Sequence, residues 1–515
     1  MHAVKRILCT SLGLLLAVTA GAGPVSARPA PPPEQLFQGE LAPLRPEFAA
    51  ALRPGGDPAA GLRRFDALLA KLPAASAERG ILLSARAEAL SDLNRQDEAI
   101  SAIEESISLL PGYSAPLFHA VDIYTFGGRP DRGADALLQA SAIDPEPINL
   151  FDDYAIKNLL NRLEDKEDRK RIAAVADRLL KLGWANGLTG TQGRLVFAAI
   201  DARLEAGDID GARALVPRLN VPARIVRILI DKKYDPIRAE AQAHAGARLE
   251  KVWPVYLAAA EARWRSTSDS FAAAEYAAAL SDAGADSKLI GTFLPLIAAG
   301  NNTVRDEGLI FAVQRVASAL AGQDRWDDAF ALLDRANEVW GKDDRAQTLN
   351  ITANRARLLV MKGDFEAGVA VFDKALTHSA QFGSEVNESA LGAFGLYRAC
   401  ALHRLGRGAE AAASEALIAR RRFLSPSYFV RLQICRGDLA TARKFLIEAL
   451  AAETSRSDAL FLLQPRDERP LASAFAREQA EGWDRLCADP AIRAAALRFG
   501  YILDEPANAA ALPLG

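Results

Sequence analysis

Apolar residues recur three and four positions apart in two neighbouring stretches that a polar segment separates. They are Leu83, Ala87 and Leu90 before the segment SDLNRQDE, and Ala99 and Ile103 after it. A spacing of three and four places side chains on one face of an α-helix, whereas alternation would indicate a strand. The pattern therefore predicts two amphipathic helices joined by a short polar turn.

The same pattern returns 34 residues further along the chain. The segment DEAISAIEESISLLP begins at Asp97, and DRGADALLQASAIDP begins at Asp131, with small, apolar and proline residues at equivalent positions. Pro111 and Pro145 close the two units, because proline lacks the amide that a continuing helix would need. A helical pair that repeats at this interval predicts an array of stacked helices.

This unit resembles the tetratricopeptide repeat, a 34-residue helical pair with a small residue early in its second helix and a terminal proline. The resemblance implies an all-α fold, a right-handed α-solenoid of degenerate tetratricopeptide-like hairpins. A small residue at Ala99 and Gly133 lets the paired helices approach closely, and a larger side chain is expected to overpack at a cost of about 1–3 kcal/mol. The positions that carry the resemblance are Ala87, Leu90, Ala99, Ile103, Ser106 and Pro111, and then Val121, Tyr124, Gly128, Gly133, Leu137, Ala140 and Pro145.

Related turns recur in the C-terminal part of the chain with less regular spacing. The small residue of the second helix is found at Ala329, Gly368, Ala411 and Ala442, at separations of 39, 43 and 31 residues. Between about residues 150 and 320 the chain still has helical patterns, but the units cannot be phased. Degenerate repeats are the favoured interpretation of this region, and a separate helical domain is the alternative.

The first 27 residues have the pattern of a bacterial secretory signal peptide. Lys5 and Arg6 precede an apolar run, and the small residues VSA place the expected cleavage after Ala27. An uncleaved anchor is less favoured, because the run is short and rich in small residues for a membrane span. The chain is therefore expected to be periplasmic or secreted, with no transmembrane segment after cleavage.

These patterns predict six segments in the chain. A signal peptide (1–27) is followed by a Pro/Ala-rich spacer and leading segment (28–60) and by N-terminal repeats (61–150). Degenerate helical repeats (151–320) and C-terminal repeats (321–455) come next, and capping helices with a tail (456–515) end the array. A solenoid needs an atypical final unit with a polar outer face, and the last segment is placed to supply it.

The cysteine count argues against a disulfide framework, since export would leave three cysteines, Cys400, Cys435 and Cys487. The first two are expected on successive helices, where a bond is conceivable in an oxidising compartment. Buried unpaired thiols that pack as small apolar side chains are the favoured interpretation.

Common signatures of enzyme chemistry are missing from the sequence. It contains no H-E-x-x-H, G-x-S-x-G, S-x-x-K or Walker A motif, and its five histidines are scattered. The segment GRGAEA, from Gly406 to Ala411, matches G-x-G-x-x-A, but it follows a helical pattern rather than a strand and is assigned to a helix–helix turn. A net charge of −3 argues against a dedicated nucleic-acid binder. We therefore expect no enzyme activity, no cofactor and no metal site.

The resemblance implies a non-catalytic scaffold that binds protein or peptide partners on a concave surface lined by the first helix of each pair. Asparagine and arginine side chains on successive first helices suit a peptide backbone and a carboxylate, although the family's carboxylate-binding set of Lys, Asn and Arg is incomplete here. Two alternatives stay open: a helical enzyme acting on envelope polysaccharide, and a scaffold subunit of polysaccharide export. The candidate contact residues are Asn350, Asn354, Arg357, Tyr397, His403, Arg404, Tyr428 and Arg431.

Overall fold

The computed structural model describes residues 36, 38–51, 58–185, 187, 189–266, 271–299, 308–341, 348–386, 388–465 and 473–506. All regular elements in this part of the chain are helices, apart from one isolated bridge between Asp231 and Gly500. The prediction of an all-α fold is confirmed. The expected signal peptide lies outside the described residues. The chain divides into two compact units, residues 1–187 and 188–515, and each is described by itself.

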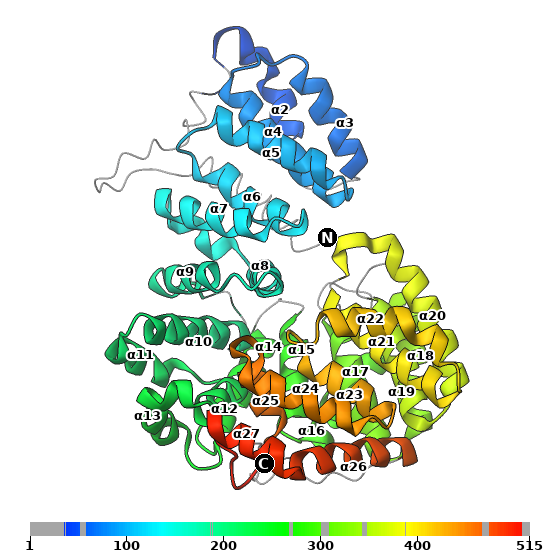
Figure 1. The fold of residues 1–515 in the computed structure, drawn as a ribbon. Helices are drawn as coiled ribbons and strands as arrows, with labels where there is room; N and C mark the ends of the chain where they lie inside the picture. Colours follow the sequence, from blue (N-terminus) through cyan, green and yellow to red (C-terminus); the bar gives the residue numbers. More distant parts are fainter. Residues whose placement is uncertain are drawn as a thin grey trace. The chain divides into compact units, whose positions relative to one another are not determined.

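The N-terminal unit is a stack of consecutive helical pairs (Figure 1). A short 3-10 helix (Gly39–Leu44) and the helices α2 (Arg45–Ala51) and α3 (Pro58–Leu69) precede the pairs. The pairs are α4 (Ala77–Asp92) with α5 (Gln96–Leu109), α6 (Ser114–Phe126) with α7 (Pro130–Ile143), and α8 (Asp153–Asp165) with α9 (Arg169–Lys181). Both helical pairs predicted from the 34-residue pattern are present.

Local sequence explains where these helices begin and why the pairs are tight. The Ser76 hydroxyl accepts a hydrogen bond from the backbone amide of Arg79 at 3.1 Å, which caps the start of α4. A β-carbon built on Gly133 in α7 would lie 2.8 Å from the Thr125 hydroxyl oxygen and 3.0 Å from the Val121 carbonyl oxygen of α6. The helices therefore approach closely where the sequence places its small residue, as predicted.

In its described residues the C-terminal unit begins with seven α-helices and continues with four regular pairs and three final helices. The first seven are α10 (Thr189–Glu205), α11 (Ile209–Leu215), α12 (Pro222–Ile230), α13 (Asp235–Ala245), α14 (Trp253–Ser266), α15 (Phe271–Asp282) and α16 (Asp286–Ala299). The pairs are α17 (Leu309–Gly322) with α18 (Trp326–Trp340), α19 (Leu349–Lys362) with α20 (Phe365–Ser379), α21 (Glu388–Arg404) with α22 (Ala412–Arg420), and α23 (Pro426–Cys435) with α24 (Leu439–Ala451). The last three are α25 (Glu453–Leu462), α26 (Ala474–Ala488) and α27 (Pro490–Phe499).

The G-x-G-x-x-A match is a helix–helix turn, as predicted. Gly406 follows the last residue of α21 by two positions and has a φ of 71°, a left-handed conformation that favours glycine. A short 3-10 helix, Gly408–Ala411, then leads into α22.

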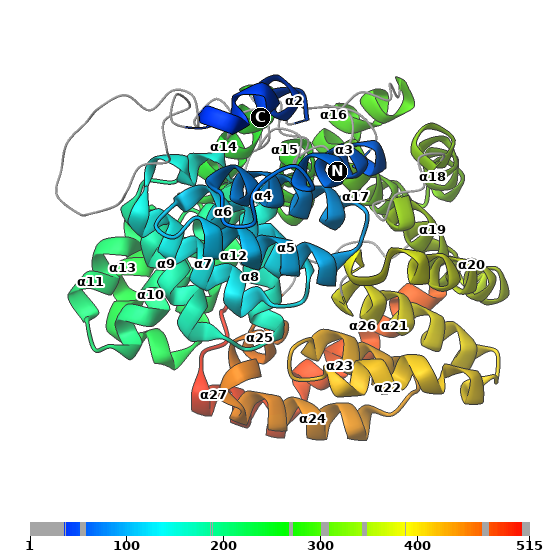
Figure 2. The ribbon, with the colours of Figure 1, turned by 90° about the horizontal axis from the view of Figure 1, so that it is seen from above.

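The last helices of the C-terminal unit return to its beginning. Helices α25 and α27 pack on α24, and α25 also contacts α12 (Figures 1 and 2). The amide of Tyr501 donates to the Ile230 carbonyl oxygen at 2.8 Å, and the Ser457 hydroxyl donates to Asp231 at 2.6 Å. The segment expected to cap the array thus covers its last pair and also joins that pair to α12, so that the unit closes on itself.

The structure corrects the interpretation of the cysteines. Cys400 in α21 and Cys435 in α23 form a disulfide, and their Cα atoms are 5.4 Å apart. These residues are on the first helices of successive pairs, which pack side by side although a whole second helix separates them in sequence. Counting cysteines could not show this contact, and the interpretation as unpaired thiols was wrong. No helix among the described residues is long and apolar enough to span a membrane.

Candidate functional site

Four first helices form a continuous row in the C-terminal unit. Helix α17 packs on α19, α19 on α21, and α21 on α23. In Figure 2 their second helices, α18, α20, α22 and α24, follow the outside of the curve, and the row follows its inside. Polar side chains cross this row from helix to helix. We call the set the polar ladder; it consists of Gln314, Ser318, Asn354, Arg357, Tyr397 and Arg431.

The first contacts of the polar ladder join α17 to α19. The Asn354 side-chain amide donates to the Gln314 side-chain oxygen at 2.9 Å, and Arg357 Nη2 donates to the Ser318 hydroxyl at 2.5 Å. Within α19, Arg357 Nε donates to Asn354 Oδ1 at 3.1 Å, and the Asn354 amide donates to the Asn350 carbonyl oxygen at 2.7 Å. These bonds hold the Arg357 guanidinium in one orientation, and the groups that accept them are neutral.

Tyr397 of α21 lies between two guanidinium groups, one from each neighbouring first helix. Arg431 Nη1 of α23 donates to the Tyr397 hydroxyl at 3.5 Å, and Arg357 of α19 also hydrogen-bonds to it. Burial raises the pKa of Tyr397, but the positive charges and hydrogen bonds of Arg431 and Arg357 outweigh burial and lower the pKa below its usual value. The tyrosine therefore reports a strongly positive local potential.

The two guanidinium groups have no carboxylate partner among the described residues. An arginine of the first helix between them does, since Arg398 Nε of α21 is 2.6 Å from Asp373 Oδ1. Arg357 and Arg431 thus place two positive charges around one neutral hydroxyl. A carboxylate bound there would gain charge-assisted hydrogen bonds, which are the stronger kind.

Two of the predicted contact residues are used in packing instead. His403 Nε2 is 2.5 Å from Glu415 Oε1 of α22, the second helix of its own pair. Arg404 forms an ion pair with Glu478 of α26, and its guanidinium carbon lies 5.4 Å from the ring centre of Phe475 in the same helix. Both side chains therefore fix neighbouring helices and do not belong to the polar ladder.

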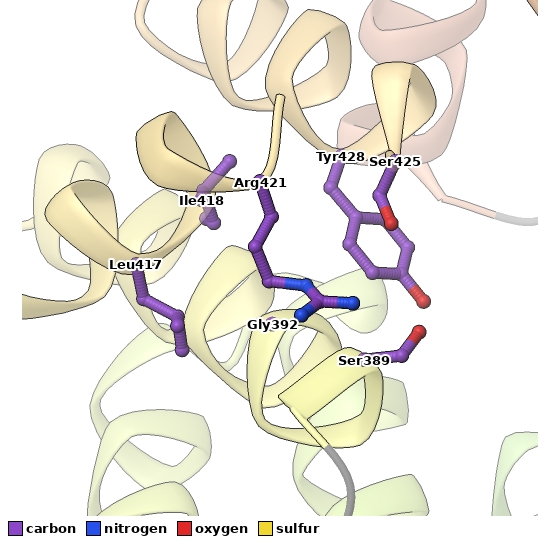
Figure 3. Close-up of a pocket in the computed structure, with 7 residues that line it drawn as sticks. All are labelled: Ser389, Gly392, Leu417, Ile418, Arg421, Ser425 and Tyr428. Atoms are coloured by element: carbon purple, nitrogen blue, oxygen red, sulfur yellow. The ribbon is translucent and has the colours of Figure 1, made fainter. Parts of the chain in front are cut away.

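Of the two remaining predicted residues, Asn350 contributes its backbone carbonyl oxygen to the bond from Asn354. Tyr428 lines a small cavity between α21, α22 and α23 (Figure 3). The cavity offers about 10 Å³ to the centre of a water molecule, enough for about one water and too little for a substrate or cofactor. Its other lining residues are Ser389, Gly392, Leu417, Ile418, Arg421 and Ser425.

A larger and more open depression of about 390 Å³ lies on the N-terminal unit, between α5, α6 and α7. Its charged lining residues all have ion-pair partners, and that of Asp135 is Arg171 of α9 at 2.8 Å. Arg132 forms an ion pair with Glu104 and stacks over the Tyr124 ring at 4.3 Å from the ring centre. Among the described residues, no three His, Cys, Asp or Glu side chains are grouped to hold a metal ion.

Sequence reasoning missed Gln314 and Ser318, the α17 end of the polar ladder. It placed both within the unphased region 151–320, although a signal was present. Ala329 was identified as the small residue of a second helix, and a second helix requires a first helix directly before it. Gln314 and Ser318 are four residues apart, so they share a face of that helix.

The disulfide lies one helical turn from the central contact of the ladder. Cys400 follows Tyr397 by three residues, and Cys435 follows Arg431 by four, so each cysteine shares a helix face with its ladder residue. The bond therefore holds α21 and α23 together at the point where Tyr397 and Arg431 meet.

Comparisons with known proteins do not assign the chain to a family. No protein-family model matches it, and no curated protein matches it. Among solved structures 74 chains match. One of them is titled "Structure of Naa15/Naa10 bound to HypK-THB"; it is 12% identical and covers 88% of this chain and 79% of its own, with a TM-score of 0.28. Similarity this weak carries no argument about fold or function, so both rest on the helices and side chains described above.

Proposed function

We propose that this chain is an exported, non-catalytic scaffold of helical repeats that binds an acidic segment of a protein partner on the polar ladder. The observation that carries the proposal is the convergence of Arg357 and Arg431 on Tyr397 without a carboxylate. Arg431 is exposed and Arg357 is partly exposed, so a ligand can reach both guanidinium groups. A row of first helices also offers a continuous surface for an extended peptide.

The partner chemistry follows from the donors that the ladder presents. A glutamate or aspartate side chain, or a terminal carboxylate, can accept two parallel hydrogen bonds from one guanidinium. The second guanidinium then balances the remaining charge. Arginine suits this role better than lysine, because its planar fork matches carboxylate geometry.

Two observations support an extracytoplasmic location, which we place in the bacterial periplasm or envelope. Residues 1–27 have the charge and hydropathy pattern of a signal peptide. The Cys400–Cys435 bond fits an oxidising compartment, because structural disulfides are rare where thiols are kept reduced.

The test is a cross-linked pull-down from envelope extract with the full chain and the double variant Arg357→Gln, Arg431→Gln. We expect the variant to bind its partner at least about tenfold more weakly, because the loss of an arginine at the centre of an interface typically has an effect of this size. Elution by a blocked peptide of alternating glycine and glutamate, but not by its glutamine counterpart, would show that carboxylates are recognised.

A matched control removes two other arginines from the same unit. In the variant Arg325→Gln, Arg407→Gln, the lost contacts are exposed ion pairs with Asp328 and Glu410, each at 2.7 Å. Such pairs contribute little to stability, so partner capture should match that of the unaltered chain. Equal capture by both double variants would refute the ladder as the binding surface. Cleavage of peptidoglycan or glycan by the purified protein would replace the scaffold with the enzyme alternative, and co-purified synthase and outer-membrane channel subunits would favour polysaccharide export.

A further inference from the structure

A second polar cluster lies in the N-terminal unit, on two neighbouring first helices. Ser84 and Glu88 are one turn apart on α4, and His119 and Asp122 are three residues apart on α6. The Ser84 hydroxyl is 2.8 Å from His119 Nδ1, and Glu88 Oε1 is 3.1 Å from the same nitrogen. We call these four residues the acceptor cluster.

Three atoms of the acceptor cluster have no hydrogen-bond partner among the described residues: Glu88 Oε2, His119 Nε2 and Asp122 Oδ1. The side chain of Glu88 is 9% exposed and that of His119 is 11% exposed, so water reaches them poorly. The imidazole proton is assigned to Nδ1, because that nitrogen faces two oxygens, and Nε2 is then an acceptor. When both carboxyl groups are ionised, the site thus presents three buried acceptors and no donor for them.

The charges around the cluster are of one sign. Burial raises the pKa of Glu88 well above its usual range, and the negative charges of Asp92 and Asp122 raise it further. Burial also raises the pKa of Asp122 to about 7, with a contribution from Asp152 of the α8 N-terminus. Burial lowers the pKa of His119 to about 4, so the ring is neutral at pH 7. The charged side chains that shift these values are all acidic, which favours a cationic ligand.

The number of acceptors indicates which cation. An ammonium group has three N–H donors and no acceptor, which matches the three unpartnered atoms. It is compact and sits on a flexible four-carbon stem, which suits side chains that are about nine-tenths buried better than a planar guanidinium does. We propose that Glu88, His119 and Asp122 form a binding site for the ammonium group of a lysine side chain from a partner polypeptide. The site uses other residues than the polar ladder, so either proposal can fail without the other.

Binding at this site is coupled to protons. A protonated carboxyl group is neutral, so it cannot form a charge-assisted hydrogen bond with the ammonium group. The ligand therefore competes with the proton for each carboxylate. For Asp122 alone, the ionised fraction rises about tenfold between pH 6 and pH 8 for a pKa of about 7. The affinity for lysine is therefore expected to rise by about that factor or more over the same range.

The test follows the histidine resonances of the full chain, labelled with [13C]histidine, during titration with the blocked pentapeptide Ac-Ala-Ala-Lys-Ala-Ala-NH2. We expect a saturable shift of the His119 resonance that strengthens from pH 6 to pH 8. Two control peptides separate charge from hydrogen bonding. One carries norleucine, which lacks the charge, and one carries trimethyllysine, which keeps the charge without N–H donors; neither should shift His119.

Variants identify the acceptors. Glu88→Gln and Asp122→Asn keep the shape of each side chain and should weaken binding at least tenfold, whereas Asp97→Asn removes one exposed acid of the same unit and should bind normally. Thermal melting shows whether each variant is folded. A His119 shift that persists in Asp122→Asn, or that trimethyllysine reproduces, would overturn the proposal. So would n-butylammonium chloride binding as tightly as the peptide, because the site would then serve a free amine.

Discussion

Replacing Cys400 and Cys435 together with alanine removes the only covalent link between α21 and α23 among the described residues. Both cysteines are buried, at 2% and 7% exposure, so the change leaves the surface of the protein as it is. The two helices would keep their packing contacts but lose the bond that lies one turn from Tyr397 and Arg431. We expect lower stability of this region and a looser polar ladder.

The magnitude follows from the length of chain that the bond closes. The cysteines are 35 residues apart in sequence. In the chain-entropy account, closing a loop of that length removes about 13 cal/mol/K from the unfolded ensemble, or about 4 kcal/mol at 25 °C. This is a ceiling, because an unfolded chain with residual structure loses less entropy. We therefore expect a loss of about 2–4 kcal/mol in the free energy of unfolding.

The assay combines guanidinium denaturation with amide hydrogen exchange. Denaturation gives the loss of stability, and exchange shows whether it is confined to α21–α24, as expected from local opening in a large helical array. Cys487→Ala is the matched control, since Cys487 forms no disulfide in the described part of the chain. The reasoning would be refuted if the double variant lost less than about 1 kcal/mol in the free energy of unfolding. It would also be refuted if a reductant did not change the stability of the unaltered chain.

Three further changes test packing and charge. Gly133→Ala should lower the free energy of unfolding by up to about 2 kcal/mol, because overpacking exceeds the gain in helix propensity. Gly61→Ala should instead raise the melting temperature, because its β-carbon would meet only a ring atom at 3.9 Å. Gly500→Ala would place a β-carbon 2.2 Å from the Ile230 carbonyl oxygen, so the C-terminal tail should detach and become sensitive to limited proteolysis. Asp122 has a folded pKa raised to about 7, so its contribution to stability is complete below pH 4 and is lost as the pH rises towards 7. Asp122→Asn should therefore stabilise the protein by up to about 4 kcal/mol at pH 8 and hardly at all at pH 4, measured by denaturation at both values.

The N-terminal pairs were predictable because all the local sequence signals there indicate the same helices and turns. The apolar stripes, the polar turns, the small residue at Gly133 and the closing prolines all repeat at one interval, and each reflects an interaction within a helix or between adjacent helices. The same local signals identified the turn at Gly406. All eight predicted contact residues lie on the first helices α19, α21 and α23 for the same reason, and four of them, Asn354, Arg357, Tyr397 and Arg431, meet in the polar ladder.

What local pattern could not show is which side chains meet across the array. His403 and Arg404 have the same sequence signature as the ladder residues, yet their partners, Glu415 and Glu478, come from a second helix and from the returning C-terminal segment. The disulfide and the contact between α12 and α25 likewise join residues far apart in the chain. In the N-terminal pairs the sequence by itself determined the helices, their pairing and the spacing of the units, because those depend on neighbours within about one repeat. Only the tertiary structure decided which polar groups are neutralised by ion pairs and which have neutral partners alone, because that depends on the packing that brings distant helices together.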